Sequence, residues 1–351
     1  MNELKKLTVP ILEWYRNNAR DLPWRRTDDP YRIWVSEIML QQTRVAAVLG
    51  YYNRFLTAFP TVTELAAASE EQLLKLWEGL GYYSRARNLQ KAAQLIVHQH
   101  DGRFPMDYDS LLRLPGIGEY TAGAIASAAY GAAVPAVDGN VLRVISRITE
   151  SYDDITDNRV KKKYRIILEE MLPPPGDDMK CFNQAMMELG ATVCLPNGEP
   201  KCDICPVREH CKAFVAGTAM QLPVKRTKKA RRIQDKTVFL MVCDGAVALR
   251  KRLKAGLLAG LWEYPNVDGI LSEAEVADAV AEFGLRIADW KQKITAKHIF
   301  THVEWHMVGY VLEVVEPNEA FTWADASTFD EYAIPSAFAR FTEQVNQIIK
   351  A

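Results

Sequence analysis

The spacing of apolar residues changes once along this chain of 351 residues, and the change limits the folds open to it. Up to about residue 220 the apolar residues recur every three or four positions, which is typical of helices that bury one face. One such series follows Asp138, a common helix-capping residue, and consists of Val141, Val144, Ile145 and Ile148. Beyond residue 236 the apolar runs are short and strand-like. The sequence therefore predicts a multidomain protein, with an all-α domain before a small α+β domain.

A basic segment separates the two patterns. Lys225–Lys236 (KRTKKARRIQDK) holds seven basic residues and one acidic residue, whereas residues 237–351 carry a net charge of −6. We expect a helical domain over residues 1–220, a basic interdomain linker over 221–236 and an α+β domain over 237–351. The linker is expected to be solvated, although it could also lie along a phosphate backbone without reading the base sequence.

Local signals place the elements of the second domain. Val238–Cys243 and Ala246–Arg250 are predicted strands, joined by Asp244-Gly245, which is a two-residue hairpin signal. Glu273–Phe283 and Ser336–Ile349 are predicted helices, and Ile294–Val315 is a strand-like stretch.

The termini and apolar runs bear on the compartment. The first ten residues (MNELKKLTVP) lack the apolar stretch of a signal peptide, and the longest apolar run, Ala122–Val137, is broken by Gly131 and Pro135. We expect a soluble, cytoplasmic protein with no membrane partner.

Four of the six cysteines lie within 18 residues, at positions Cys194, Cys202, Cys205 and Cys211. Disulfides are disfavoured in the cytoplasm, and thiolates packed this densely repel one another unless a cation or a cluster holds them. The loop 194–211 is therefore expected to bind metal. Its chemistry leaves structural zinc and an iron–sulfur cluster equally open.

Two glycine-containing turns favour contact with DNA. Leu114–Gly118 (LPGIG) lies between two helical segments, where Gly116 and Gly118 can take positive φ and bring backbone N–H groups close to a phosphate. Gly79–Tyr83 (GLGYY) is an aromatic turn with basic residues after it, as a protein that presses into a DNA groove needs. Either sequence alone could be an ordinary tight turn.

Two carboxylic acids could perform acid–base chemistry. Asp29-Pro30 predicts the start of a helix that runs through Gln41, and Glu37 lies in its apolar run, where burial raises a carboxyl pKa. Asp138 is the second candidate and lies at a predicted helix start, where a role as an N-cap would also explain an aspartate. A protonated acid paired with a carboxylate is the combination that breaks glycosidic bonds.

Together these motifs resemble the helix-hairpin-helix DNA glycosylases of the endonuclease III superfamily. Within it, four segments are similar to adenine DNA glycosylases of the MutY type: SEIMLQQTRV, WEGLGYYSRARNL, PAVDGNVLRV and FNQAMMELGATVC. The resemblance covers essentially the whole chain. It implies one 4Fe-4S cluster on the four clustered cysteines. It also implies base excision repair of double-stranded DNA, with removal of adenine mispaired with 8-oxoguanine or guanine.

The resemblance also implies roles for single residues. Glu37 would protonate adenine at N7, and Asp138 would stabilise the deoxyribosyl cation, with Asn140 and Tyr120 steadying the site. The adenine pocket would contain Trp24, Arg25 and Gln184. The DNA-binding set would be Gln42, Thr43, Leu80, Tyr82, Gly116 and Gly118. Tyr120 stands where bifunctional relatives carry a lysine, and a phenol cannot form a Schiff base, so a monofunctional glycosylase is expected.

The C-terminal domain resembles a Nudix fold, with Gly260–Pro265 (GLWEYP) at its characteristic entry. The stretch Glu275–Leu285 lacks the glutamate cluster that would hold magnesium, so the resemblance implies reading of the opposite base by Phe300, Thr301 and His302. Without it, Phe300 would be strand core and His302 an ordinary strand residue. The chain departs from the family pattern at two points: seven residues instead of six separate Cys194 from Cys202, and Thr301 replaces a serine.

Two other functions remain as alternatives. An endonuclease III-like glycosylase and lyase is opposed by Tyr120 and by the Nudix-like domain. A non-catalytic iron–sulfur DNA-binding protein is opposed by the joint presence of Glu37 and Asp138, because binding needs neither carboxyl group. We expect the protein to act as a monomer, associated with the nucleoid in a prokaryote.

Overall fold

The computed structural model describes residues 3–226 and 230–350. The chain divides into two compact units: Met1–Ala67 with Arg87–Thr227, and Ala68–Ala86 with Lys228–Ala351. Within the described residues, no helix combines the length and the apolar character that crossing a membrane requires.

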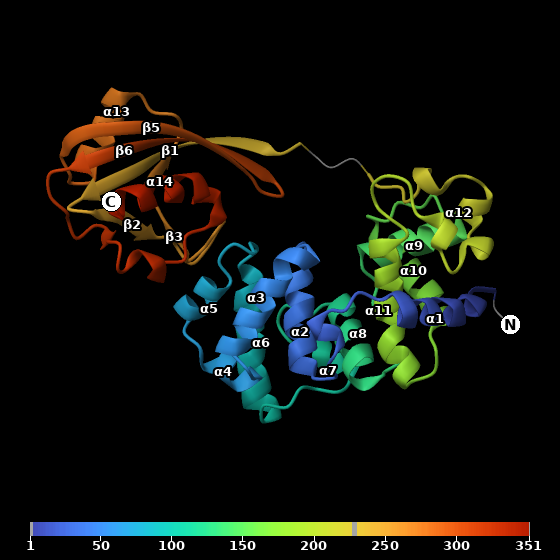
Figure 1. Ribbon diagram of the computed structural model, residues 1–351. Helices are drawn as coiled ribbons and strands as arrows, with labels where there is room; N and C mark the ends of the chain where they lie inside the picture. Colours follow the sequence, from blue (N-terminus) through green and yellow to red (C-terminus); the bar gives the residue numbers. More distant parts are fainter. Residues whose placement is uncertain (1–2, 227–229, 351) are drawn as a thin grey trace. The chain divides into compact units, whose positions relative to one another are not determined.

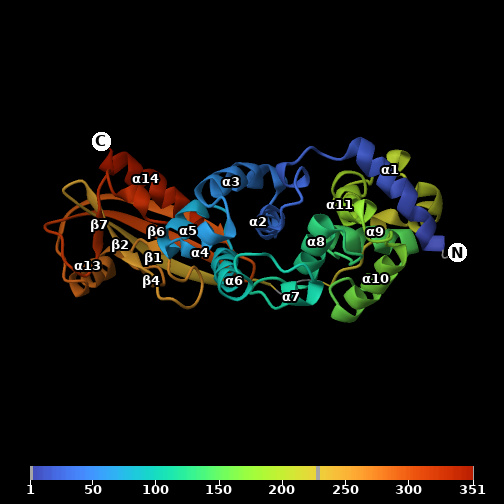
Figure 2. The same ribbon diagram turned by 90° about the horizontal axis from the view of Figure 1, so that it is seen from below.

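The first unit is helical, as the apolar spacing predicts (Figure 1). Its helices are α1 (Thr8–Asn18), α2 (Pro30–Leu40), α3 (Val45–Ala58), α4 (Val62–Ala67), most of α6 (Ser84–His100), α7 (Tyr108–Leu112), α8 (Glu119–Tyr130), α9 (Gly139–Thr149), α10 (Asn158–Met171), α11 (Asp177–Thr192) and α12 (Lys212–Val215). Helix α11 packs against α1, α8 and α9, and Figure 2 shows this group of helices from below.

The predicted helix starts are confirmed at two caps. The Asp29 carboxylate accepts a hydrogen bond from the Tyr31 backbone N–H at 2.9 Å and caps α2. The Asp138 carboxylate accepts one from the Val141 backbone N–H at 2.8 Å and caps α9. Such caps satisfy N–H groups that have no partner within the helix.

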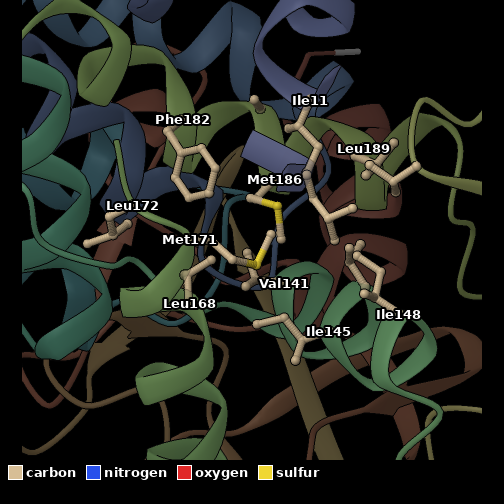
Figure 3. Close-up of a cluster of buried hydrophobic side chains, with 14 of the residues drawn as sticks. Ile11, Val141, Ile145, Ile148, Leu168, Met171, Leu172, Phe182, Met186 and Leu189 are labelled. Carbon is tan, nitrogen blue, oxygen red and sulfur yellow. The ribbon is translucent and has the colours of Figure 1, made fainter. Parts of the chain in front are cut away.

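An apolar core holds helices α1, α9, α10 and α11 together (Figure 3). It contains the predicted apolar face of α9 and the inner faces of α1, α10 and α11, with side chains that include Ile11, Val141, Ile145, Leu168, Phe182, Met186 and Leu189. Because this core is closely packed, the start of α9 and the adjacent face of α11 are held in fixed relation to each other.

The second unit contains a mixed sheet with a helix on each face (Figure 1). Its strands are β1 (Arg232–Cys243), β2 (Ala246–Lys251), β3 (Trp262–Glu263), β4 (Asn266–Asp268), β5 (Ile287–Ile299), β6 (Val303–Val314) and β7 (Thr322–Ala324). The main strand order is β3-β2-β1-β6-β5, in which β1 and β6 are parallel. The two inner cores face α13 (Glu273–Glu282) and α14 (Ala339–Ile349), and alternate residues of β1 enter each core. This is the expected α+β domain.

Three features differ from the expected element boundaries. The stretch Ile294–Val315 is an antiparallel hairpin of β5 and β6 rather than one strand, and residues 300–302 form its turn. Strand β1 begins at Arg232, inside the segment 221–236 expected as a linker, because Arg232–Lys236 pair in register with Val303–Met307 of β6. Residues 227–229 of that segment lie outside the described residues.

A helical segment groups with the sheet rather than with the other helices. Helix α5 (Glu70–Leu76) and the turn after it belong to the second unit. The Lys75 ammonium donates to the Tyr332 carbonyl at 3.2 Å, and the Ile334 backbone N–H donates to the Glu78 carboxylate at 2.9 Å. The predicted helical domain over residues 1–220 does not anticipate this grouping.

Candidate active site

A cavity of about 680 Å³ in the first unit brings together all the predicted catalytic and adenine-pocket residues and some of the predicted DNA-binding ones. Its lining draws on α2, α8, α9 and α11 and on the short turn before α2. The predicted residues that line it are Trp24, Arg25, Glu37, Gln42, Thr43, Gly118, Tyr120, Asp138, Asn140 and Gln184. Residues that are up to about 160 positions apart in sequence thus share one cavity.

Glu37 is a buried carboxyl in this cavity. Its side chain projects from α2 among apolar neighbours, and the residue is 9% exposed. The Tyr120 hydroxyl donates to Glu37 Oε2 at 2.5 Å. Burial raises the pKa of Glu37 to about 7, with a further rise from Asp138 and opposing effects from the Tyr120 hydrogen bond and Arg25. The protonated form is therefore well populated near neutral pH, as expected for a general acid.

Asp138 combines both roles that its sequence position allows. One carboxylate oxygen caps α9, and Oδ2 accepts a hydrogen bond from the Asn140 amide at 2.7 Å. Burial raises the pKa of Asp138, while the hydrogen bonds to its carboxylate and the Arg143 charge lower it. Asp138 therefore caps α9 and also lines the cavity.

Asn140 is itself held by neighbouring groups. The Arg143 guanidinium donates to Asn140 Oδ1 at 2.8 Å and to the Gly190 and Cys194 carbonyls at 2.7 Å each. A Cβ atom at Gly190 would lie 2.6 Å from Asn140 Cβ, so glycine is needed for this approach of α11 to α9.

The lining of the cavity also contains a polar network. Tyr15 donates its hydroxyl hydrogen to Gln184 Oε1 at 2.7 Å. Arg25 donates from Nη2 to Glu188 Oε2 at 2.7 Å, and the Trp24 ring packs edge-on against Tyr52. Sequence reasoning missed Arg20 and Glu188, both of which line the cavity. The available signal was the position of Glu188 four residues after Gln184, which places both on one face of α11.

The two glycine turns adopt different backbone conformations. Gly116 has φ +77°, and its Cα faces Asn88 so closely that a Cβ would lie 2.8 Å from Asn88 Cβ. Gly118 instead has φ −99° and is the N-cap of α8, so it does not take the positive φ considered for it. In the second unit, Gly79, Gly81 and Tyr82 all have positive φ.

The Tyr82 turn exposes the ring of Tyr82 and buries the side chain of Leu80. Tyr82 is 45% exposed, whereas Leu80 is 7% exposed. The Arg85 guanidinium donates to the Leu80 and Gly81 carbonyls at 3.1 Å each and lies over the Tyr82 ring. The Tyr82 hydroxyl is hydrogen-bonded to Thr301 Oγ1 at 2.9 Å.

The predicted opposite-base residues form the turn between β5 and β6. Thr301 and His302 are exposed, and the partly buried Phe300 ring packs against the His298 and Trp305 rings. Phe300 is thus partly a core residue, but neither it nor His302 lies within a strand.

The four clustered cysteines line one small, apolar pocket together with Arg147 and Arg208. The Arg147 guanidinium donates to Cys194 Sγ at 3.2 Å. Burial raises the pKa of Cys205 to about 12, with a further rise from the other three cysteines. In the described parts of the chain, no three or more His, Cys, Asp or Glu side chains are arranged to hold a metal ion.

Two domain families match the chain. Residues 35–170 match the HhH-GPD superfamily of base excision DNA repair proteins, and residues 237–344 match the NUDIX domain. A thermostable thymine-DNA glycosylase of known structure has a TM-score of 0.54 and 27% identity, and the match covers 61% of this chain and 97% of that one.

Whole-chain relatives are adenine DNA glycosylases. The protein from Arabidopsis thaliana is 40% identical over 78% of this chain, which spans about half (49%) of that relative's length. The protein from Buchnera aphidicola (subspecies Acyrthosiphon pisum) is 31% identical over 97% of both chains. Because the similarity to the Buchnera protein extends over nearly the full length of both chains and an HhH-GPD domain match accompanies it, the chain belongs to the family of adenine DNA glycosylases.

Proposed function

We propose that the cavity hydrolyses the N-glycosidic bond of adenine opposite 8-oxoguanine or guanine in double-stranded DNA and leaves the strand uncut. The observation that carries the proposal is that one cavity holds both Glu37, whose pKa is raised to about 7, and the carboxyl group of Asp138. A flipped base could enter this cavity, and flipping costs less at a mispair than at a normal pair.

In the proposed mechanism Glu37 supplies the proton. A carboxyl group with a pKa near the working pH donates a proton efficiently, and protonation at N7 lets adenine depart as a neutral base. Tyr120 orients the acid by donating to Glu37 Oε2. Glu37 can therefore present its other oxygen, Oε1, to the base.

Asp138 supplies the negative charge that the reaction needs. As the bond breaks, positive charge develops on the deoxyribose, and at ~4 Å with an effective dielectric of about 20 a carboxylate would stabilise it by roughly 4 kcal/mol. Water then adds to C1′ of this cation and gives its proton to Glu37, which restores the acid and completes the hydrolysis. Hydrogen bonds from the Val141 backbone and from Asn140 hold the carboxylate in place before this charge forms.

Strand cleavage is not expected of this site. A β-lyase reaction requires an amine that attacks the sugar carbon, but the relevant position holds the Tyr120 phenol, which is hydrogen-bonded to Glu37. Burial, followed by the charges of Glu37 and Asp138, raises the Tyr120 pKa further, so this phenol stays protonated.

We further propose one 4Fe-4S cluster on Cys194, Cys202, Cys205 and Cys211. The four cysteines line one pocket, and four cysteine thiolates in one closed loop are a ligand set that suits a 4Fe-4S cluster. A bound cluster would supply positive charge that keeps its cysteine ligands as thiolates, and the Arg147 hydrogen bond would help to orient the Cys194 sulfur.

Recognition of the opposite base is proposed for the β5–β6 turn. Thr301 is exposed, and its hydroxyl, hydrogen-bonded to Tyr82, links the reading turn to the aromatic ring that would wedge into the duplex. A hydroxyl has one donor and two acceptor sites, so the hydrogen bond to Tyr82 leaves Thr301 capacity for a further partner.

The test is release of free adenine from a duplex with adenine opposite 8-oxoguanine, measured under single-turnover conditions with and without alkali. We expect adenine release, with strand breaks only after alkali.

Asp138→Asn should lower the rate by at least about 100-fold while mispair binding persists, because asparagine still caps a helix. Asp157→Asn, at the equivalent cap of α10, is the matched control and should keep full activity. Strand breaks before alkali would instead favour the endonuclease III-like lyase, and loss of binding in Asp138→Asn would assign Asp138 a mainly structural role.

A further inference from the structure

Glu188 is a charged residue in the lining of the cavity, and the proposed mechanism gives it no role. It is fully buried on α11, at 0% exposure, yet it lines the cavity. Burial would raise the pKa of Glu188, but hydrogen bonds from Arg20 and Arg25 lower it to about 2. The carboxylate is therefore ionised and paired with two guanidinium groups.

The oxygens of Glu188 are already saturated. Oε1 accepts from the Arg20 backbone N–H at 3.0 Å and from Arg20 Nε at 2.7 Å. Oε2 accepts from Arg20 Nη2 at 2.6 Å and from Arg25 Nη2 at 2.7 Å. A carboxylate has about four acceptor sites, so these four hydrogen bonds leave Glu188 no capacity to bind a base directly.

Arg25 is immobilised as a result. Besides its bond to Glu188, Arg25 donates from Nη1 to the Arg20 carbonyl at 3.0 Å and lies over the Tyr15 ring, 5.5 Å from the centroid. Only 13% of its side chain is exposed. A guanidinium has five N–H donors in a rigid plane, and two of them are used here, so the fixed remainder can face the cavity.

We propose that Glu188 is a positioning residue that orients Arg25 in the wall of the adenine pocket. Glu188 acts through Arg25 and does not touch the base. A fixed donor costs no reorganisation when the base enters, whereas a loose arginine must lose side-chain entropy first. The inference rests on the proposed role of Arg25 in the adenine pocket.

A double-mutant cycle tests the proposal. Single-turnover adenine release is measured for the unmodified protein, Glu188→Gln, Arg25→Ala and the double variant. Glu188→Gln should slow release roughly tenfold or more in the presence of Arg25 and less than about twofold in the Arg25→Ala background, since coupled residues are not additive. Equal losses in both backgrounds would overturn the proposal.

A conservative variant separates positioning from folding. Glu188→Asp keeps the charge, so it should retain more activity than Glu188→Gln, whereas loss of the charge leaves two arginines with no anionic partner. Thermal unfolding is followed in parallel. If Glu188→Gln does not fold, Glu188→Asp carries the cycle, because its shorter side chain cannot reach both arginines and the same non-additivity with Arg25→Ala is expected.

The outcomes distinguish this inference from the proposed function. If the unmodified protein releases no adenine, the proposed function fails. If it releases adenine and Arg25→Ala has no effect, the role of Arg25 fails and the present inference fails with it. If Arg25→Ala slows release but the Glu188→Gln losses are additive, only the positioning role of Glu188 is wrong.

Discussion

Burial and the hydrogen bond from Tyr120 act in opposite directions on the pKa of Glu37. Burial has the largest effect on Glu37 and raises its pKa to about 7, and the hydrogen bond opposes that rise because it stabilises the carboxylate. The folded-state pKa lies above the ordinary carboxyl value. The active, protonated form is therefore complete well below pH 7 and is lost as the pH rises through about 7.

This sign predicts the pH dependence of adenine release. Single-turnover rates should fall on the alkaline side with a midpoint close to the pKa of Glu37. Tyr120→Phe removes a hydrogen bond that lowers this pKa, so the midpoint should move to higher pH, by about one unit at most for a bond of ~1 kcal/mol. Rates measured from about pH 5 to about pH 9 check this shift. A midpoint that stays fixed or moves to lower pH would contradict the assignment of Glu37 as the acid.

The same residues show what sequence reasoning can reach. The burial of Glu37 and its raised pKa were predictable, because a glutamate within an apolar helical run loses its solvation when that run packs against other elements. The Glu188 network was not, because its significance depends on Arg20, more than 160 positions away, and no local pattern reports such a pairing. The sequence allowed Gly118 a positive φ, but it could not show that this glycine is instead an extended N-cap of α8, because a glycine before a helix can serve either purpose.

At the level of elements, local signals placed the helices well and the edges of the sheet poorly. Asp29-Pro30 and Asp138 marked α2 and α9 because helix caps are made by nearby residues. The start of β1 was missed because Arg232–Lys236 look like a charged linker until β6 pairs with them. The stretch 294–315 concealed the β5–β6 turn, since Phe300 resembles a strand residue in sequence.

The cysteine loop provides a prediction at the same scale. Protein purified without oxygen should be brown, with about four irons and four sulfides per chain. Cys202→Ser should reduce the visible absorption and lower the midpoint of thermal unfolding, because a ligand of the cluster is lost. Cys181→Ser, which alters a half-buried cysteine outside the loop, is the control and should leave both unchanged. Colourless protein with one zinc per chain would refute the cluster.

At the scale of the whole molecule, the Tyr82 turn belongs to the same compact unit as the β-sheet. Tyr82 is tied to Thr301, and the segment before it is tied to the stretch before α14 through Lys75 and Glu78. The β5–β6 turn, which we propose to read the opposite base, and the Tyr82 turn should therefore respond together to changes in the C-terminal part of the chain.

Truncation tests this coupling. A chain that ends at Arg226 removes β1 completely, whereas a cut after Lys236 would leave five residues of β1 without the β6 strand they pair with. We expect the truncated protein to release adenine more slowly and to lose most of its preference for 8-oxoguanine over guanine opposite adenine, because both Thr301 and the support of the Tyr82 turn are gone. The preference is measured as the ratio of single-turnover rates on the two duplexes.

Thr301 variants of the full chain separate the two causes of that loss. Thr301→Val keeps the shape and removes the hydroxyl that bonds Tyr82, so it should reduce the preference, while Thr301→Ser keeps the hydroxyl and should preserve it. If truncation abolishes the preference and Thr301→Val does not change it, the preference depends on the support of the Tyr82 turn or on a contact elsewhere in the sheet, and not on the Thr301 hydroxyl. If truncation itself leaves the preference intact, the reader is not in residues 230–350 at all, and the Tyr82 turn must then act without the hydrogen bond from Thr301.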